Sequence, residues 1–190
     1  MSEAQEEELA RIWAQLTRGA ADKRSALNTP AIATVATDGA PSIRTVVLRA
    51  VRPADRLLQF HTDPRSAKFT ELAMDARVSW HFWEPRQKVQ LRVATQASLH
   101  HGDAVARTVW GGLHSGGRRI YRQAASPGGV VNDSTAASDT LIAEADAFEN
   151  FAVVNTTAIR IEWLHLATTG HRRAHWVWDD AQWSGAWLAP

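Results

Sequence analysis

Segments with the period of a β-strand, separated by short turn sequences, follow one another along most of this chain. Residues 31–37 and 42–51 are two such segments, and the dipeptide Asp38-Gly39 between them is typical of a hairpin turn. A short turn leads into a third segment at 57–61, so we interpret the three as an antiparallel meander. Further strands are expected at residues 77–83, 89–99, 158–166, 171–178 and 182–188.

Four other segments have helical patterns. The first lies within residues 1–20, where acidic residues crowd the first turns and an apolar face follows at helical spacing. The others are expected at residues 63–73, 103–113 and 139–151. Residues 124–138 are rich in serine, glycine, proline and asparagine, and we interpret them as a mobile loop. Because neither a repeat nor a break in composition divides the chain, residues 1–190 are expected to form one domain.

The fold class follows from this order of elements. Many antiparallel strands interrupted by short helices favour a mainly β fold with peripheral helices, in the form of a closed or nearly closed barrel. A β-sandwich built from the same elements is the alternative on pattern alone.

Composition sets bounds on function. The chain has 21 basic and 20 acidic residues and a net charge of +1, so nucleic acid is not expected as a partner. It has no cysteine, which excludes disulfides, thiolate metal sites and cysteine nucleophiles. No apolar run approaches the roughly 20 residues of a membrane span, and the acidic N-terminus is unlike a signal peptide. We therefore expect a cytoplasmic protein without membrane contact.

Two arginines flank a strongly apolar stretch of the second expected strand. Arg44 and Arg49 enclose residues 45–48, and two positive charges in such surroundings are unfavourable to bury without partners. An anionic ligand is one such partner, and strand-end arginines that reach solvent are the alternative. Because residues five apart on a strand point to opposite faces, both arginines can hold one small group only if the strand is bulged.

Residues 61–68 run from the end of a strand into the start of a helix, where unpaired backbone N–H groups point outward. Thr62 and Ser66 add hydroxyl groups at this place, and Lys68 adds a cation. A strand end, a helix start and a lysine together favour a phosphate site. An ordinary capped helix with a solvated lysine is the alternative.

Two further groups of side chains could bind a ligand. Gln90 and Arg92 share one face of their strand, where an amide could contact the polar edge of a heterocycle or belong to a solvent-facing row. His165, His171 and His175 lie close in the sequence, but no carboxylate of suitable spacing joins them. We therefore expect no metal site.

In their order, these motifs resemble the pyridoxamine 5′-phosphate oxidase-like family, the FMN-binding split barrels. Arg44-Thr45-Val46-Val47-Leu48-Arg49 resembles the family's Arg-x-Val-Leu-Leu-Lys strand, and residues 61–68 resemble its Tyr-Thr-Asn…Ser-Arg-Lys phosphate-binding turn. Residues 90–93 are similar to its Gln-Val-Arg-Val strand, and residues 122–126 to its Gln-Ser-Ser stretch. The resemblance covers the chain from about residue 31 and implies an antiparallel, FMN-binding split β-barrel.

The resemblance also implies roles for individual residues. Arg44 and Lys68 would hold the FMN phosphate, assisted by Ser66 and the start of the helix. The other cofactor-binding residues that it implies are Thr45, Val46, Val47, Arg49, His61, Thr62, Gln90 and Gln123. Because the family's flavin lies at a subunit interface, we expect a homodimer in which Gln90 and Gln123 serve a shared FMN site.

Departures from the family pattern leave the substrate open. Ala67 stands where the family has the arginine of Ser-Arg-Lys, although Arg65 could take its place. The family's substrate-binding residues on its middle helix have no match at residues 106–114. The residues that we expect to contact a small anionic substrate are Arg49, Arg172, Arg173 and His175. No residue is assigned as a catalytic acid or base.

These considerations lead to an expected function. We expect an FMN-dependent oxidoreductase that acts on an unidentified small molecule, with the flavin supplying the redox chemistry and the protein supplying orientation. One alternative is a pyridoxamine or pyridoxine 5′-phosphate oxidase proper. The other is a flavin- or haem-binding module without turnover.

Overall fold

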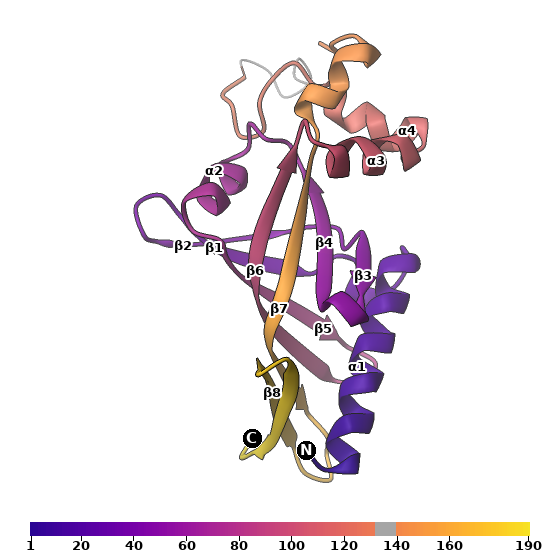
Figure 1. Ribbon diagram of the computed structural model, residues 1–190, viewed down its shortest axis with the longest axis vertical. Helices are drawn as coiled ribbons and strands as arrows, with labels where there is room; N and C mark the ends of the chain where they lie inside the picture. Colours follow the sequence, from indigo (N-terminus) through magenta and orange to yellow (C-terminus); the bar gives the residue numbers. More distant parts are fainter. Residues whose placement is uncertain (132–139) are drawn as a thin grey trace.

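The computed structural model describes residues 1–131 and 140–190 of the chain, and nine strands form one sheet within them (Figure 1). The strands are β1 (Ala31–Val35), β2 (Pro41–Thr45), β3 (Ala50–Arg52), β4 (Leu57–Thr62), β5 (Arg77–Glu84), β6 (Val89–His101), β7 (Ala152–His165), β8 (Arg172–Asp179) and β9 (Gln182–Leu188). The helices are α1 (Glu3–Ala21), α2 (Ala67–Met74), α3 (Ala104–Gly112) and α4 (Ser115–Arg119), and the 3₁₀ segments are η1 (Ala26–Asn28), η2 (Pro53–Asp55), η3 (Ile120–Arg122) and η4 (Glu144–Asn150).

All strand pairs are antiparallel, and the main path through the sheet is β2-β1-β5-β6-β7-β4-β3. The sheet splits along β7, whose first half pairs with β4 and whose second half pairs with β8. A bulge between Ala94 and Thr95 of β6 lies at the place where β7 changes partner, and bulges increase local twist. The expectation of a mainly β, antiparallel split barrel with peripheral helices is confirmed.

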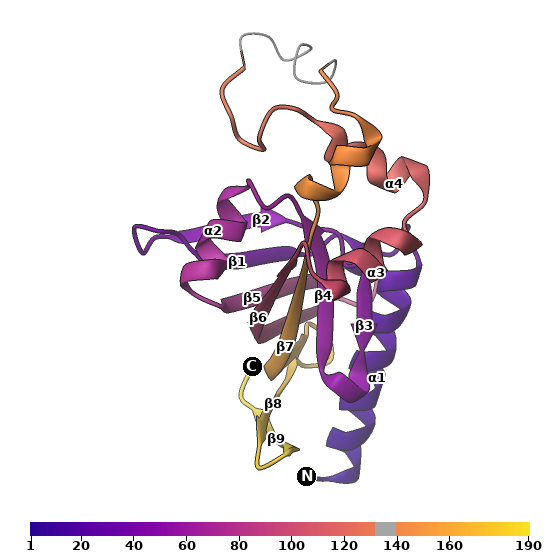
Figure 2. The same ribbon diagram turned by 45° about the horizontal axis from the view of Figure 1, so that its top comes forward.

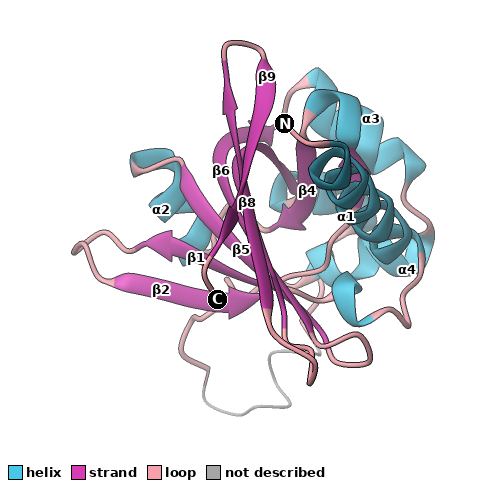
Figure 3. Cartoon of the chain, turned by 90° about the horizontal axis from the view of Figure 1, so that it is seen from below, coloured by secondary structure: helices cyan, strands magenta, loops and turns pink. Residues whose placement is uncertain are grey.

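Helices cover the sheet at three places. In Figure 1 β6 and β7 run side by side along the molecule, α3 and α4 lie at one end, and the β8–β9 hairpin lies at the other. Seen from below in Figure 3, α1 and α2 lie on opposite sides of the molecule. Among the described residues, no helix combines the length and apolar composition that a bilayer crossing requires.

The main core lies between α1 and the inner face of the sheet. The apolar face predicted for residues 1–20 is buried as expected, at Leu9, Ile12, Trp13 and Leu16. Within the sheet Trp80 stacks on Phe82 at 5.7 Å, and its indole N–H donates to Thr156 Oγ1 at 3.1 Å. Full burial of such an apolar side chain contributes roughly 1.5–3 kcal/mol, so this core fixes the strands that carry the site.

The single strand expected at 42–51 is wrong, and so is the meander. β2 ends at Thr45, β3 begins at Ala50, and residues 46–49 cross between distant strands. The N–H groups of Val46 and Leu48 donate to the carbonyls of Pro30 (3.0 Å) and Asn28 (2.8 Å), not to a partner strand. β2 therefore pairs with β1, whereas β3 pairs with β4 at the other end of the sheet order.

The helix expected at 139–151 is wrong as well. Within 140–151 the regular structure is the 3₁₀ segment Glu144–Asn150, preceded by a bridge between Leu141 and Gln123. The amide of Asn150 donates to the carbonyl of Tyr121 at 3.0 Å, which fixes this segment against η3 rather than in a longer helix. Of the loop expected at 124–138, residues 132–138 lie outside the described residues, as does residue 139 of the expected helix.

Candidate functional site

The junction between β4 and α2 brings together most of the predicted phosphate-binding side chains. Thr62 is the last residue of β4, and Ser66 precedes the first turn of α2. Their hydroxyl oxygens lie 3.1 Å apart, and Ser66 Oγ donates to the carbonyl of Asp63 at 2.7 Å. The ammonium group of Lys68 donates to Thr62 Oγ1 at 3.3 Å. The predicted turn chemistry of residues 61–68 is thus present as a compact hydroxyl and ammonium cluster.

Arg44 reaches the same place from the sheet. It extends from β2 toward α2, where Nη2 donates to Glu71 Oε2 at 2.7 Å. Its guanidinium also donates to the hydroxyl groups of Thr34 and Ser42. α2 lies against β1 and β2 (Figure 2), so this arginine bridges sheet and helix. We call Arg44, Thr62, Ser66, Lys68 and Glu71 the β4–α2 cluster.

The electrostatics of the β4–α2 cluster are dominated by cations removed from water. Burial lowers the pKa of Lys68, and the positive charge of Arg44 lowers it further. The carboxylates of Asp63 and Glu71 act in the opposite direction but do not outweigh these effects. An added anion would stabilise the ammonium form of this lysine, because opposite charge at close range favours the charged state.

Arg65 has a structural role in this region. It forms an ion pair with Asp63 at 2.7 Å and donates to the carbonyls of Gln123 and Ala124, both at 3.0 Å. These bonds tie the turn after β4 to the segment that follows η3. Four of its five N–H donors are used in this way, so Arg65 holds the turn in place, and its substitution for the family arginine at position 67 stays a prediction.

Arg49 lies away from the hydrogen bonds of Arg44, beside His61 and the buried Tyr121. The pKa of His61 is lowered to about 4, first by burial and then by the charge of Arg49. Its ring packs edge-on against Phe151 at 5.1 Å. The neutral imidazole of His61 and the exposed guanidinium of Arg49 therefore lie close together at the C-terminal end of the 46–49 crossover. Along that crossover Val46 is buried, Val47 is half-buried and Thr45 is exposed.

A cavity of about 420 Å³ opens next to this region. Its walls include Asp63, Tyr121, Gln123 and residues 125–129. Among the described residues no hydrogen-bond partner reaches Oε1 of Gln123, although this atom is buried. Burial raises the pKa of Tyr121 to about 12, so its hydroxyl stays protonated. Sequence reasoning missed Tyr121; its position two residues before Gln123 in the Gln-Ser-Ser-like stretch was the available signal.

Gln90 lies on the outward face of the sheet rather than in the β4–α2 cluster. Its Oε1 is 3.2 Å from Nε2 of His81. Farther along the same face, three arginines converge on Glu162, at 3.4 Å from Arg92, 2.8 Å from Arg160 and 3.1 Å from Arg173. We call these four residues the Glu162 cluster.

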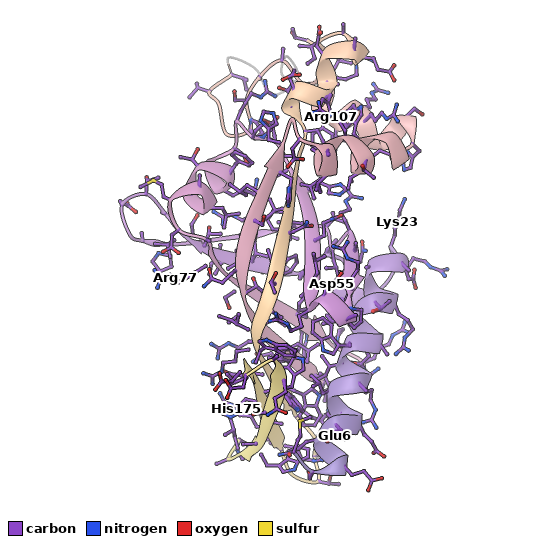
Figure 4. All side chains as sticks on the ribbon, in the orientation of Figure 1. Glu6, Lys23, Asp55, Arg77, Arg107 and His175 are labelled. Carbon is purple, nitrogen blue, oxygen red and sulfur yellow. The ribbon has the colours of Figure 1, made fainter. Side chains whose placement is uncertain are left out.

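The predicted substrate contacts near the C-terminus are divided between two faces of β8. Arg173 bonds to Glu162 on the outward face, whereas the guanidinium of Arg172 lies 4.8 Å from the ring of Trp187 on the other. In Figure 4 His175 lies toward the lower end of the molecule, well below Arg77, which closely follows α2. The structure therefore does not bring these residues to the β4–α2 cluster within one chain.

The described residues hold no group of three or more histidine, aspartate or glutamate side chains arranged to bind a metal ion. His165, His171 and His175, which are close in sequence, are separated by strand geometry. His165 ends β7, His171 precedes β8 and His175 lies within it.

Comparisons with known proteins show which sequences and structures this chain is similar to. Residues 10–101 match the sequence model of a family described as pyridoxamine 5′-phosphate oxidase, FMN-binding domain. No curated protein sequence matches the chain. A pyridoxamine 5′-phosphate oxidase-related, FMN-binding protein from Nostoc punctiforme PCC 73102 has a similar structure, with 22% identity, a TM-score of 0.78 and full coverage of both chains.

Two further solved structures share the fold. PhzG from Burkholderia lata 383, in complex with tetrahydrophenazine-1-carboxylic acid, is 19% identical with a TM-score of 0.75, over 98% of this chain and 93% of that one. A pyridoxinephosphate oxidase-family protein from Clostridium acetobutylicum is 11% identical with a TM-score of 0.55, over 96% of each chain. Residues 10–101 are thus similar in sequence to the FMN-binding domain of the pyridoxamine 5′-phosphate oxidase family, and the whole chain shares the split-barrel fold of these structures.

Proposed function

We propose that this chain binds FMN, with the phosphate held by Arg44, Lys68 and the first turn of α2. The observation that carries the proposal is that two partly desolvated cations, Arg44 and Lys68, lie together in the β4–α2 cluster, where Glu71, the ion-pair partner of Arg44, is the one carboxylate. Two positive charges and one negative charge leave a surplus of one. A phosphate group, with a charge of about −1.5 to −2 at pH 7, would more than offset this surplus and would accept charge-assisted hydrogen bonds from both cations.

The remaining residues of the β4–α2 cluster fit the same group. The hydroxyls of Thr62 and Ser66 lie beside Lys68, and the first N–H groups of α2 have no intrahelical partners. Helix starts of this kind favour anions because their N–H groups carry a partial positive charge. The buried Oε1 of Gln123 is an acceptor without a donor among the described residues, and the N–H edge of a flavin is a suitable donor.

We propose further that the protein with FMN bound is an oxidoreductase. When bound, FMN supplies an isoalloxazine ring that accepts and returns electrons. The chain supplies binding and orientation: the crossover at 46–49 offers backbone and apolar contacts, and Arg49 offers an exposed cation beside the cavity. The substrate that suits this arrangement is a small anionic molecule, with Arg49 as its contact.

A homodimer is part of the proposal, because Gln90, Arg173 and His175 lie away from the β4–α2 cluster of their own chain. The outward sheet face that carries Gln90 also exposes apolar side chains, notably Ile43, which is 70% exposed. Packing of two such faces would bury these apolar groups and bring the outward residues of one subunit to the flavin of the other. An FMN site shared between subunits accounts for both observations.

The test is an absorption spectrum of concentrated protein after addition of FMN and removal of the excess. We expect a retained flavin spectrum in the natural protein and sharply reduced retention in R44A and K68A. K23A and R107A are matched controls, because these exposed cations lie elsewhere on the molecule (Figure 4). Unchanged retention in both R44A and K68A would place the phosphate elsewhere.

The redox proposal has its own readout. A flavin that is reduced by a pyridine nucleotide or a dye and reoxidised by an acceptor supports an oxidoreductase. Conversion of pyridoxamine or pyridoxine 5′-phosphate to pyridoxal 5′-phosphate would identify the substrate and replace the broader assignment. A bound flavin that none of these reagents reduces would contradict turnover.

A further inference from the structure

Glu71 is the centre of a closed set of hydrogen bonds around Arg44. Its carboxylate accepts from Thr34 Oγ1 at 2.5 Å, from Ser42 Oγ at 3.1 Å and from Arg44 Nη2 at 2.7 Å. The same two hydroxyl oxygens accept from the guanidinium of Arg44. Arg44 is therefore linked to Glu71 once directly and twice through a hydroxyl group.

Glu71 and Arg44 together set the direction of these bonds. A carboxylate only accepts, so the hydroxyl hydrogens of Thr34 and Ser42 must point to it. Their lone pairs are then left for the N–H groups of Arg44, which can only donate. A side-chain amide in place of the carboxylate would present an N–H donor where one oxygen stood. One hydroxyl would then accept from this N–H, and its own hydrogen would point toward the N–H groups of Arg44, which also only donate.

Burial places the carboxylate beneath the guanidinium. The side chain of Glu71 is 7% exposed and that of Arg44 is 20% exposed. Three of the five N–H donors of Arg44 are used by Thr34, Ser42 and Glu71, which leaves Nε–H and one Nη1–H without a partner among the described residues. Lys68 lies three residues before Glu71 on α2, so one helix carries both the phosphate lysine and the anchor of the phosphate arginine.

We propose that Glu71 is a positioning residue, which holds the guanidinium of Arg44 through Thr34 and Ser42 so that its two remaining donors serve the phosphate of the flavin nucleotide. This role rests on the proposed FMN site. Its consequence is selectivity: Glu71 governs binding of the phosphorylated flavin and leaves binding of riboflavin, which lacks the phosphate, unaffected.

The opposite role is that of an internal competitor, in which the carboxylate occupies Arg44 and repels the phosphate. The geometry of Glu71 argues against this competitor role. The three hydrogen bonds and the low exposure of Glu71 keep the carboxylate below the guanidinium, and these bonds together with the charge of Arg44 keep its pKa low despite burial. The two roles predict changes of opposite sign in FMN affinity, so one variant separates them.

The experiment is a parallel titration of flavin-free protein with FMN and with riboflavin, followed by quenching of flavin fluorescence. In E71Q we expect the Kd for FMN to rise about tenfold, because a set of charge-assisted hydrogen bonds loses its orientation. The Kd for riboflavin should stay within about twofold, so the preference for FMN shrinks by the same factor. Tighter FMN binding in E71Q, or an unchanged preference, would overturn the proposal.

Controls separate positioning from general stabilisation. D75N changes a half-buried carboxylate that follows the same helix and pairs with Arg77, and it should leave both titrations unchanged. A loss of stability is expected in either case, but a purely structural role of Glu71 would weaken FMN and riboflavin by equal factors, which would also contradict the proposal. S42A removes one of the two hydroxyl links and serves as a milder variant should E71Q not fold, with a loss of FMN preference of about threefold.

The outcome for the natural protein separates this role from the proposed function. A natural protein that binds neither FMN nor riboflavin contradicts the FMN site itself. A natural protein that prefers FMN, loses this preference in R44A and keeps it in E71Q supports the site but excludes the role of Glu71.

Discussion

Two clusters of basic side chains in this protein have opposite balances of burial and charge. In the β4–α2 cluster a partly buried arginine and lysine share one buried carboxylate, Glu71. In the Glu162 cluster three arginines share one carboxylate on the outward sheet face, and their side chains are 34–52% exposed. Water solvates the surplus charge in the second cluster but much less so in the first. A ligand phosphate is therefore expected where the cations are desolvated, although the other cluster holds more of them.

The largest difference is expected in stability. E71A removes the carboxylate from a largely buried pair and leaves Arg44 without its counterion, which should lower the free energy of unfolding by about 3 kcal/mol. E162A removes the partner of exposed arginines and should lower it by less than about 1 kcal/mol. Urea denaturation of both variants measures this difference, and equal losses would mean that burial does not distinguish the two clusters.

Ligand binding gives the second comparison. R44A should weaken FMN about a hundredfold, since it removes a charged donor from a desolvated phosphate site. R160A should change the Kd for FMN by no more than about twofold, because Arg160 already contacts Glu162 at the surface. Equilibrium titration followed by flavin fluorescence provides both constants. A stronger effect of R160A than of R44A would move the phosphate to the outward face.

The two clusters also differ in how far sequence could predict them. Thr62, Ser66 and Lys68 act within one turn of chain, so strand-end and helix-start patterns reveal them. Glu71 bonds to Thr34 and Ser42, which are 37 and 29 residues away, and only the pairing of β1 with β2 against α2 brings them together. No local pattern contains that information. The residue roles inferred from family resemblance stay predictions until a ligand is bound.

The same distinction explains the errors in the fold. β5 and β6 alternate buried and exposed residues over most of their length, so their period of two was a reliable signal. Residues 46–49 continue an apolar strand-like run, but the N–H groups of Val46 and Leu48 bond to the carbonyls of Pro30 and Asn28, which no propensity encodes. The break matters for function, because it separates the side chain of Arg44 from that of Arg49 and directs them to different neighbours.

Acidification tests the region around Arg49 and His61. Burial and the charge of Arg49 lower the pKa of His61 from 6.5 to about 4, so between these values the unfolded chain binds a proton that the folded chain does not. Stability should therefore be full above pH 6.5 and fall as the pH decreases toward 4, by about 2 kcal/mol once the residual exposure of the ring is allowed for.

Urea denaturation at a series of pH values measures this slope. H61F keeps an aromatic ring against Phe151 and should remove this part of the pH dependence. Substitution of the exposed His81 is the control and should leave the slope as it is in the natural protein. The contribution of Glu71, whose pKa is lowered from 4.5, is lost only at more acidic pH, so the two effects occupy different windows. A slope that survives in H61F would assign the effect to another group.

The smallest expected effect is a difference in salt dependence. In E162Q the arginines of the Glu162 cluster repel one another on an exposed face, and raising the ionic strength from 0.1 to 1 M shortens the screening length from about 10 Å to about 3 Å. The loss of stability in E162Q should therefore shrink by roughly half, a change of less than about 0.5 kcal/mol. The loss in E71Q should hardly change, because salt does not enter the space between Arg44 and a carboxylate that is 7% exposed. Equal salt sensitivity in both variants would mean that solvent reaches both clusters alike, and the reason for expecting phosphate at β4–α2 rather than at Glu162 would be lost.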